Sequence, residues 1–272
     1  MIRVLVALVG ALVVWFSTLG PPMYAAILGK TLAYYSLDEA SGANATDASG
    51  GGRTLTQNNT VGTGAGASAG TGTSRDFTQS SLTYLQRTDS TFSRTGDFAV
   101  SACVNAESIV NNNTGSGAAI ASYMSGDQAG DWWVSVGHDG WVQFGHFVTN
   151  GDNATGRRTT GPAKVGTSAW RHVVAMKAGS TFTVHVQNVS ESLTETATNT
   201  GWSNIGFNIG RHYTDQSYHF DGLIDEQLVT SDDLTADEIT FLYNGGNCRS
   251  WADIQNEGGA ASPQRLLLLG VG

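Results

Sequence analysis

Short runs of alternating apolar and polar residues recur along most of the chain. The pattern is clear in Leu32–Leu37, Phe98–Val104 and Thr181–Val186, and Arg75–Leu85 adds further strand-like sequence. Successive side chains of an extended chain point to opposite faces, so each run predicts a β-strand with one face toward a core.

A hairpin is predicted where Trp170–Met176 is followed by Thr181–Val186. Trp170, His172 and Val174 would share one face of its first strand. We expect His172 to be a packed structural histidine rather than a catalytic residue or a ligand.

A second hairpin is predicted in Asp131–Val148. A three-residue turn at His138–Gly140, with Gly140 in the left-handed conformation, sets Val136 opposite Val142. One face then carries Trp132, Val134, Val136, Val142 and Phe144. The other carries Trp133, Ser135, Trp141 and Gln143. A two-residue turn would mix apolar and polar residues on both faces, which favours the first register.

One short helix is predicted over Thr235–Asn244. Thr235 and Glu238 have the spacing of a capping box, and Leu234 can contact Ile239 across the helix start. Gly245 is expected to end the helix. Ile239, Leu242 and Tyr243 form its single apolar face.

The composition favours one domain with many short strands. The chain has 272 residues, of which 35 are glycine, and only 14% are charged. Tight turns between strands explain so much glycine, and Gly62–Gly72 is predicted as a surface loop. A single β-sandwich of this size is ordinary. The 23 acidic and 14 basic residues give a net charge of -9, which opposes nucleic-acid binding and suits hard cations instead.

The two cysteines, Cys103 and Cys248, leave their pairing open. Two separate, mainly buried thiols are favoured over a mutual disulfide, because sequence alone carries no geometry. No Cys/His cluster indicates zinc.

Both ends of the chain are apolar. Residues 1–30 contain Arg3 and then a long apolar run, and are predicted to be a signal peptide or a membrane anchor through residues 2–19. The alternative is a reading frame that starts at Met23. Residues 251–272 form a tail whose end, 266–272, contains four leucines and could bind another subunit or assembly. The protein is therefore expected to be secreted or on the cell surface, or in a virion if it is phage-encoded.

Three ordered motifs resemble one family. They are LAYYSLDEASGANATDASG at the amino-terminal side, WRHVV in the middle, and IGR, FDGLIDE and LTADEITFLYNGG near the end. Together they resemble the laminin-G-like, concanavalin A-like lectin and glucanase domains over residues 31–250. The resemblance implies an all-β fold, a two-sheet antiparallel jelly-roll sandwich of roughly 12 to 14 strands with one short helix.

The resemblance also implies a structural Ca²⁺ ion. Asp225 matches the aspartate of the family's FDGxIDE motif, and Asp38 and Asp47 lie in the matching amino-terminal loop. Carboxylates are the ligands that calcium prefers. The alternative is that Asp38 and Asp47 are ordinary turn residues.

No catalytic motif is present. The glucanases of this superfamily place two carboxylates on one strand in a Glu-x-Asp-x-x-Glu arrangement, and the chain has no such triplet. We therefore expect a non-enzymatic, lectin-like module that binds a glycan or glycoconjugate. A structural or adhesive component of a cell-surface or virion assembly is the alternative, and a glycoside hydrolase is less favoured.

The second hairpin supplies the candidate glycan site. Sugars bind where an aromatic platform lies beside amide, hydroxyl or carboxylate groups. The predicted ligand-binding residues are Trp133, Trp141, Gln143, Asp139, His212 and Tyr213. The competing interpretation is that another segment covers the two tryptophans.

Overall fold

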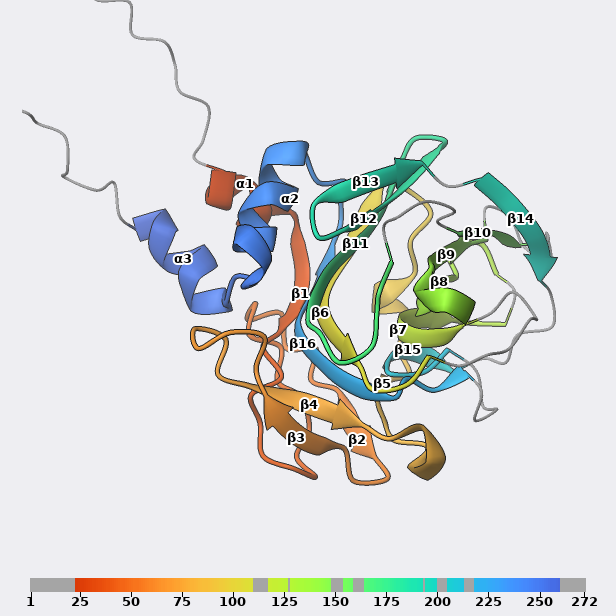
Figure 1. The fold of residues 1–272 in the computed structure, drawn as a ribbon. Coiled ribbons are helices and arrows are strands. Elements are labelled where there is room, and N and C mark those ends of the chain that lie inside the picture. The colour runs from red at the N-terminus through yellow and green to blue at the C-terminus, as the bar shows by residue number, and fades with distance from the viewer. Residues whose placement is uncertain are drawn as a thin grey trace, which may run out of the picture.

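The chain folds as two antiparallel β-sheets packed face to face (Figure 1). The computed structural model describes residues 23–109, 117–126, 128–147, 154–158, 164–192, 194–199, 205–212 and 218–259. Within these residues every pairing between named strands is antiparallel. The predicted two-sheet jelly-roll sandwich is confirmed, although the described residues form the strands β1 to β16 rather than the 12 to 14 strands predicted.

The first sheet contains the strands at both ends of the domain. Its order is β13 (Val189–Ser192), β12 (Thr181–Val186), β11 (Arg171–Ala178), β6 (Phe98–Ala106), β16 (Gly222–Thr230), β4 (Thr73–Phe77) and β3 (Gly62–Ala65), with β1 (Thr31–Tyr35) also paired to β16. The pairing of β1 with β16 brings the amino-terminal motif against the FDGLIDE motif.

The second sheet contains the predicted tryptophan hairpin. Its order is β14 (Thr194–Asn199), β10 (Ala154–Arg158), β9 (Val142–His146), β8 (Trp132–Val136), β7 (Ala118–Met124), β15 (Gly206–Ile209), β5 (Tyr84–Arg87) and β2 (Thr56–Asn58). The hairpin has the predicted register, with Val136 opposite Val142 and Gly140 at a φ of +76°.

The main core fills the space between the sheets. Its aromatic members include Phe77, Phe92, Phe98, Trp132, Phe144 and Phe207, all fully buried. Phe92 stacks on Phe207 with ring centroids 3.9 Å apart. The hairpin face that carries Trp132, Val134 and Phe144 points into this core, as predicted.

Three helices cover the outer face of the first sheet. They are α1 (Met23–Lys30), α2 (Ala236–Tyr243) and α3 (Trp251–Gly259), and they lie together beside β1 and β16 in Figure 1. A second apolar cluster joins them to the sheet, with Ile27, Leu228, Leu234, Ile239, Leu242 and Ile254 among its buried members. On the outer face of the second sheet, Phe147 and Ile205 pack on Trp133.

Helix α2 begins as the sequence predicts. Thr235 accepts a hydrogen bond from the Glu238 backbone N–H, and the Glu238 side chain accepts one from the Thr235 N–H. The sequence predicts that Gly245 ends the helix. The helix ends one residue earlier, because Asn244 adopts the left-handed conformation. Helix α3 was not predicted.

Cys103 of β6 and Cys248, which follows α2, form a disulfide with Cα atoms 6.6 Å apart. The preference for two separate thiols is therefore wrong. The two residues are 145 positions apart, and the fold brings them together because α2 returns the chain across β6.

The predicted terminal segments lie mostly outside the described residues. This holds for residues 2–19 and 266–272, whose roles as signal or anchor and as assembly contact stay predictions. The described helices include none that is long and apolar enough to span a membrane. Helices α1 and α3 fall within the segments predicted as leader and tail, yet both pack on the sandwich.

Candidate functional site

The two predicted tryptophans of the binding face each lie over a glycine. The pairing of β8 with β9 sets Trp133 opposite Gly145, and Gly137 donates its N–H to the Trp141 carbonyl. A Cβ atom on Gly145 would lie 2.0 Å from the Trp133 ring, and one on Gly137 would lie 2.3 Å from the Trp141 ring. The glycines thus let both indoles lie flat on the sheet.

The tryptophans do not form an open platform. Trp133 is fully buried and Trp141 is 8% exposed. Trp133 packs with Met124, Phe147 and Ile205 in a small apolar cluster. The interpretation that other segments cover these rings describes the structure better than an exposed platform does.

The other predicted site residues are only partly brought together. His212 stacks on Trp133 with ring centroids 6.0 Å apart, and Gln143 lies on the same hairpin face but is buried. Asp139 is exposed at the turn. Tyr213 lies outside the described residues.

A row of directly opposed residues crosses the second sheet from Trp133. Its members, in order, are Trp133, Ser122, Asn208, Gln86 and Thr56. Opposed residues in an antiparallel ladder share a face, so one aromatic, two hydroxyl and two amide side chains line one side of the sheet. Sequence analysis found only the first member, because the pairing of strands so far apart in the chain was not visible.

The row opens to solvent at the edge formed by β2 and β5. A hollow of about 470 Å³ lies there, lined by Thr54, Thr56, Asn58, Gln86, Arg87, Thr88 and Asp89. Beside it the Arg211 guanidinium lies 3.6 Å above the ring of Tyr84, two residues from Gln86 on the same face. The hollow therefore combines amide, hydroxyl and ionic groups next to an aromatic ring.

The middle of this face holds polar atoms without partners. Ser135 and Gln143 lie opposite each other, and both the Ser135 Oγ and the Gln143 Oε1 are buried without a hydrogen bond. Leaving such an atom unpaired costs about 1–3 kcal/mol. Because they lack hydrogen bonds, neither of these two atoms stabilises the fold.

The three predicted calcium ligands do not form one site. The carboxylate of Asp47 accepts the backbone N–H groups of Tyr34, Ser49 and Arg53, so it organises its own loop. The Asp38 Oδ1 accepts the Thr73 N–H at 2.7 Å. Among the residues that the structure describes, no three acidic, histidine or cysteine side chains gather closely enough to hold a metal. The predicted trio does not fit calcium, and a metal stays a prediction.

Asp225 is buried at the centre of the first sheet. Its carboxylate accepts the N–H groups of Ala67 and Glu226. Burial, together with the nearby Asp38 charge, raises the pKa of Asp225 to about 7. The carboxylate thus ties the Gly66–Gly72 turn to β16.

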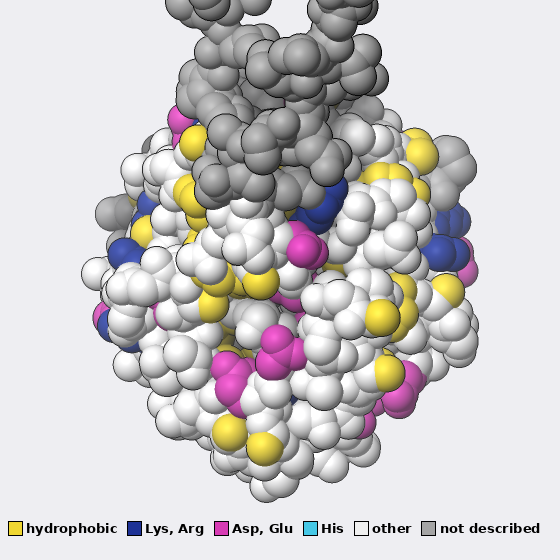
Figure 2. Space-filling model, turned by 90° about the vertical axis from the view of Figure 1, so that its left-hand side faces the viewer, with side chains coloured by type: hydrophobic (Ala, Val, Ile, Leu, Met, Phe, Trp, Pro, Cys, Tyr) yellow, Lys and Arg dark blue, Asp and Glu magenta, His cyan; other side chains and the backbone are white. Residues whose placement is uncertain are grey.

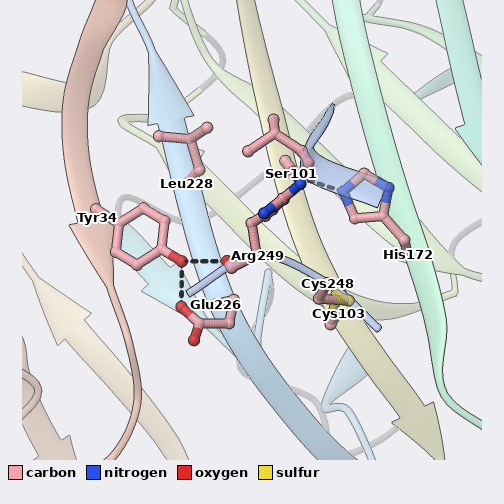
Figure 3. Close-up of a pocket in the computed structure, with 9 residues that line it drawn as sticks. Tyr34, Ser101, Cys103, His172, Glu226, Leu228, Cys248 and Arg249 are labelled. Atoms are coloured by element: carbon pink, nitrogen blue, oxygen red, sulfur yellow. Dashed lines mark hydrogen bonds between the residues drawn. A yellow bond between two sulfur atoms is a disulfide. The ribbon is translucent and has the colours of Figure 1, made fainter. Parts of the chain in front are cut away.

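Glu226 meets Tyr34 and the Arg249 backbone in a small cavity (Figure 3). The Tyr34 hydroxyl lies within hydrogen-bond reach of the Glu226 Oε2 and, at 2.9 Å, of the Arg249 carbonyl. One hydroxyl has one proton, so it satisfies both only if Glu226 is protonated and donates. Burial and the Asp225 charge raise the pKa of Glu226 to about 10, which agrees.

His172 is a structural residue, as predicted. It lies near the same cavity (Figure 3), and its Nε2 is 2.9 Å from the Ser101 Oγ. Burial lowers its pKa to about 3. A neutral, enclosed imidazole of this kind packs the sheet and the disulfide region.

The architecture defines a jelly-roll domain of the lectin type. The family model described as the concanavalin A-like lectin/glucanases superfamily matches residues 79–240. The chain belongs to this superfamily. No curated protein sequence matches it.

Solved structures share the fold at low sequence identity. Domain 4 of the extracellular arabinanase AbnA from Geobacillus stearothermophilus has a TM-score of 0.54 and 20% identity, over 78% of this chain and 97% of that one. The binding domain of Paraclostridial Mosquitocidal Protein 1 has a TM-score of 0.55 and 15% identity, covering 80% and 52%. The receptor-binding domain of botulinum neurotoxin type G has a TM-score of 0.52 and 13% identity, covering 79% and 51%. The chain spans about half the length of the two toxin domains.

Proposed function

We propose that the protein is a non-catalytic carbohydrate-binding module whose ligand lies on the outer face of the second sheet. The open end of the row, where Gln86 and Thr56 line the hollow, carries the proposal, because Trp133, Ser122 and Asn208 are fully buried. Sugar rings present apolar C–H faces edged by hydroxyl groups, and the hollow offers amide and hydroxyl groups beside the Tyr84 ring. The hollow at Gln86 and Thr56 is where a ligand would enter.

The structural relatives agree with this proposal. The AbnA domain is described in complex with arabinotriose, and botulinum neurotoxin type C is described as entering cells through two ganglioside molecules. The match covers 97% of the AbnA domain and 78% of the present chain. Arabinose oligosaccharides are therefore the first ligands to test.

The same face argues against glycoside hydrolysis. A retaining or inverting glycosidase needs two carboxylates on either side of the scissile bond. The row from Trp133 to Thr56 contains none. The adjacent acids Asp225 and Glu226 belong to the other sheet and are buried by contacts within the fold.

We also infer export from the cell. The Cys103–Cys248 disulfide supports this localisation, because disulfides persist mainly in oxidising compartments. Secretion of a tagged full-length chain, followed by free-thiol titration, would test it. Two free thiols in the mature protein would contradict it.

A glycan array that includes arabino-oligosaccharides tests the proposed function. We expect binding by the wild-type protein and at least a tenfold loss with Gln86→Ala or Thr56→Ala, because each removes a hydrogen-bonding group of the open hollow, a loss of about 1.4 kcal/mol. Thr181→Ala, an exposed threonine on the first sheet, is the matched control and should bind normally. Absence of binding to any glycan, or an equal loss in the control, would refute the proposal.

A further inference from the structure

A second hollow lies beside α3, on the far side of the sandwich from the polar row. Its volume is about 340 Å³. It is lined by Ser36, Asp38, Ala48, Gly70, Thr71, Gly72, Glu226, Ser250, Trp251, Ala252 and Gln255. Figure 2 shows acidic side chains gathered around a hollow at the centre of this face.

Most of this hollow is built by parts of the chain that the family match omits. The match covers residues 79–240, whereas α3, the loop at Asp38 and the turn at Thr71 lie outside it. Only Glu226 comes from the matched part. The hollow is thus formed where α3 packs against the two amino-terminal loops.

Two of its residues have buried polar atoms without partners. The Glu226 Oε1 has no hydrogen bond, and the residue is only 5% exposed. The Trp251 Nε1 is also buried and unpaired, while its ring lies 4.6 Å from that of Tyr34. An indole N–H can only donate, whereas the Oε1 is available to accept.

The chemistry of these two atoms selects the kind of ligand. A metal ion or an ammonium group would satisfy the Glu226 oxygen but leave the Trp251 N–H unpaired. A hydroxyl group both donates and accepts, so neighbouring hydroxyls of one molecule can serve both atoms. Ser36, Thr71 and Gln255 add further hydrogen-bonding groups on the walls.

We propose that the hollow between α3 and the Asp38 and Thr71 loops is a second saccharide-binding site, in which Trp251 and Glu226 hydrogen-bond adjacent hydroxyls of a neutral sugar. The proposal takes its ligand class from the proposed function, and its location is independent of the polar row. Binding here would clamp α3 to the sandwich.

Site-resolved NMR can test this proposal on the full chain. The protein would be labelled with 5-fluorotryptophan, and the signals of Trp251, Trp133 and Trp141 assigned with Trp→Phe variants. Arabinotriose, cellotriose and maltotriose are the probes, and Ca²⁺ alone is a separate titration. We expect a saturable shift of the Trp251 signal with at least one trisaccharide, weakened at least tenfold by Glu226→Met, which removes the Oε1 acceptor at similar side-chain length.

The possible results separate the two sites. Shifts confined to Trp133 or Trp141 would support the proposed function and overturn the second site. A Trp251 shift that persists in Gln86→Ala confirms that the second site binds by itself. A Trp251 shift with Ca²⁺ and with no sugar would overturn it in favour of a metal, and absence of any shift would overturn both sites. Thermal melting checks that Glu226→Met is folded, and Gln255→Ala serves as a second variant if it is not.

Discussion

Gly145 shows how a single missing side chain can fix the position of a large one. A Cβ atom on Gly145 would lie only 2.0 Å from the Trp133 ring. The ring therefore occupies the space that a side chain at residue 145 would need. We predict that Gly145→Ala destabilises the protein by about 1–3 kcal/mol, because the indole must move within a packed cluster. Chemical denaturation monitored by tryptophan fluorescence would measure the change.

Gly96→Ala is the matched control for Gly145→Ala. Nothing lies within 4 Å of a Cβ at Gly96, and its φ is not in the left-handed region. The control should be neutral or slightly stabilising, by up to about 1 kcal/mol. If Gly145→Ala and Gly96→Ala changed the free energy of unfolding equally, the Trp133 ring would not depend on the space left by Gly145.

His172 makes stability depend on pH in the acid range. Its pKa is about 3 in the folded protein, against 6.5 in the unfolded chain, because burial excludes the charged form. Below pH 6.5 the unfolded chain therefore binds a proton that the native state rejects, and stability falls as the pH falls toward 3. Above pH 6.5 this contribution is constant.

We predict that His172→Gln reduces the slope of stability against pH. The wild-type slope from this residue is about 1.4 kcal/mol per pH unit between the two pKa values. Urea denaturation at several pH values would measure it. Parallel profiles for the two proteins would show that His172 does not titrate in this range.

At the level of residues, the sequence predicts which side chains share the outer face of the tryptophan hairpin but not that they are buried. The alternation rule placed Trp133 and Gln143 together on the face away from the main core, which the structure confirms. The burial of Trp133 depends on Phe147, Ile205 and His212, which contact it in the folded chain. No local pattern encodes that cover, so the open platform could not be excluded beforehand.

At the level of elements, the start of α2 is determined by local sequence, because its capping box forms as predicted. Thr235→Ala removes the side chain that caps the Glu238 N–H and should cost about 1 kcal/mol. Thr235→Ser keeps the cap and should cost only a few tenths of that. Thermal melting of the two variants would measure the difference, and equal losses would mean that the cap contributes little.

Two elements were missed for different reasons. Helix α3 begins at a second capping pair, in which the Asp253 N–H donates to the Ser250 Oγ at 3.2 Å. The Ser-x-x-Asp spacing is the sequence signal for this helix start. Strand β3 lies in the glycine-rich stretch predicted as a loop, and it forms because it pairs with β4. Its strand character therefore comes from a partner rather than from local preference.

At the scale of the whole molecule, contacts between α1 and α3, the first and last helices of the described chain, hold the two ends of the domain together. Ile27 of α1 is fully buried in the cluster with α2 and α3, and the Lys30 Nζ lies 3.0 Å from the buried Glu238 carboxylate. We predict that Ile27→Ala costs about 2–5 kcal/mol, as is usual for an isoleucine truncated in a core. Calorimetry would measure it, with Gly29→Ala as a control, since open space surrounds that position.

A melting temperature unchanged by Ile27→Ala would mean that α1 is dispensable for the sandwich. Removal of the predicted signal peptide, residues 1–30, would also remove α1, so this experiment also bears on how much of the amino terminus the folded domain can lose. A large loss would favour a mature protein that keeps residue 27.

The disulfide also determines how the domain would respond to mechanical tension. A force applied across α1 and α3 would pull on the two ends of the domain, which lie side by side. Cys103 and Cys248 close a covalent loop between residues 145 positions apart, so the load passes through the sulfur atoms and bypasses the chain between them. That chain would span roughly 500 Å if fully extended. Strands β7, β8, β9 and β10 of the second sheet lie inside the loop, whereas β2 and β5, which carry the proposed ligand hollow, lie outside it. Tension would therefore open the ligand hollow while the centre of the sheet stays protected.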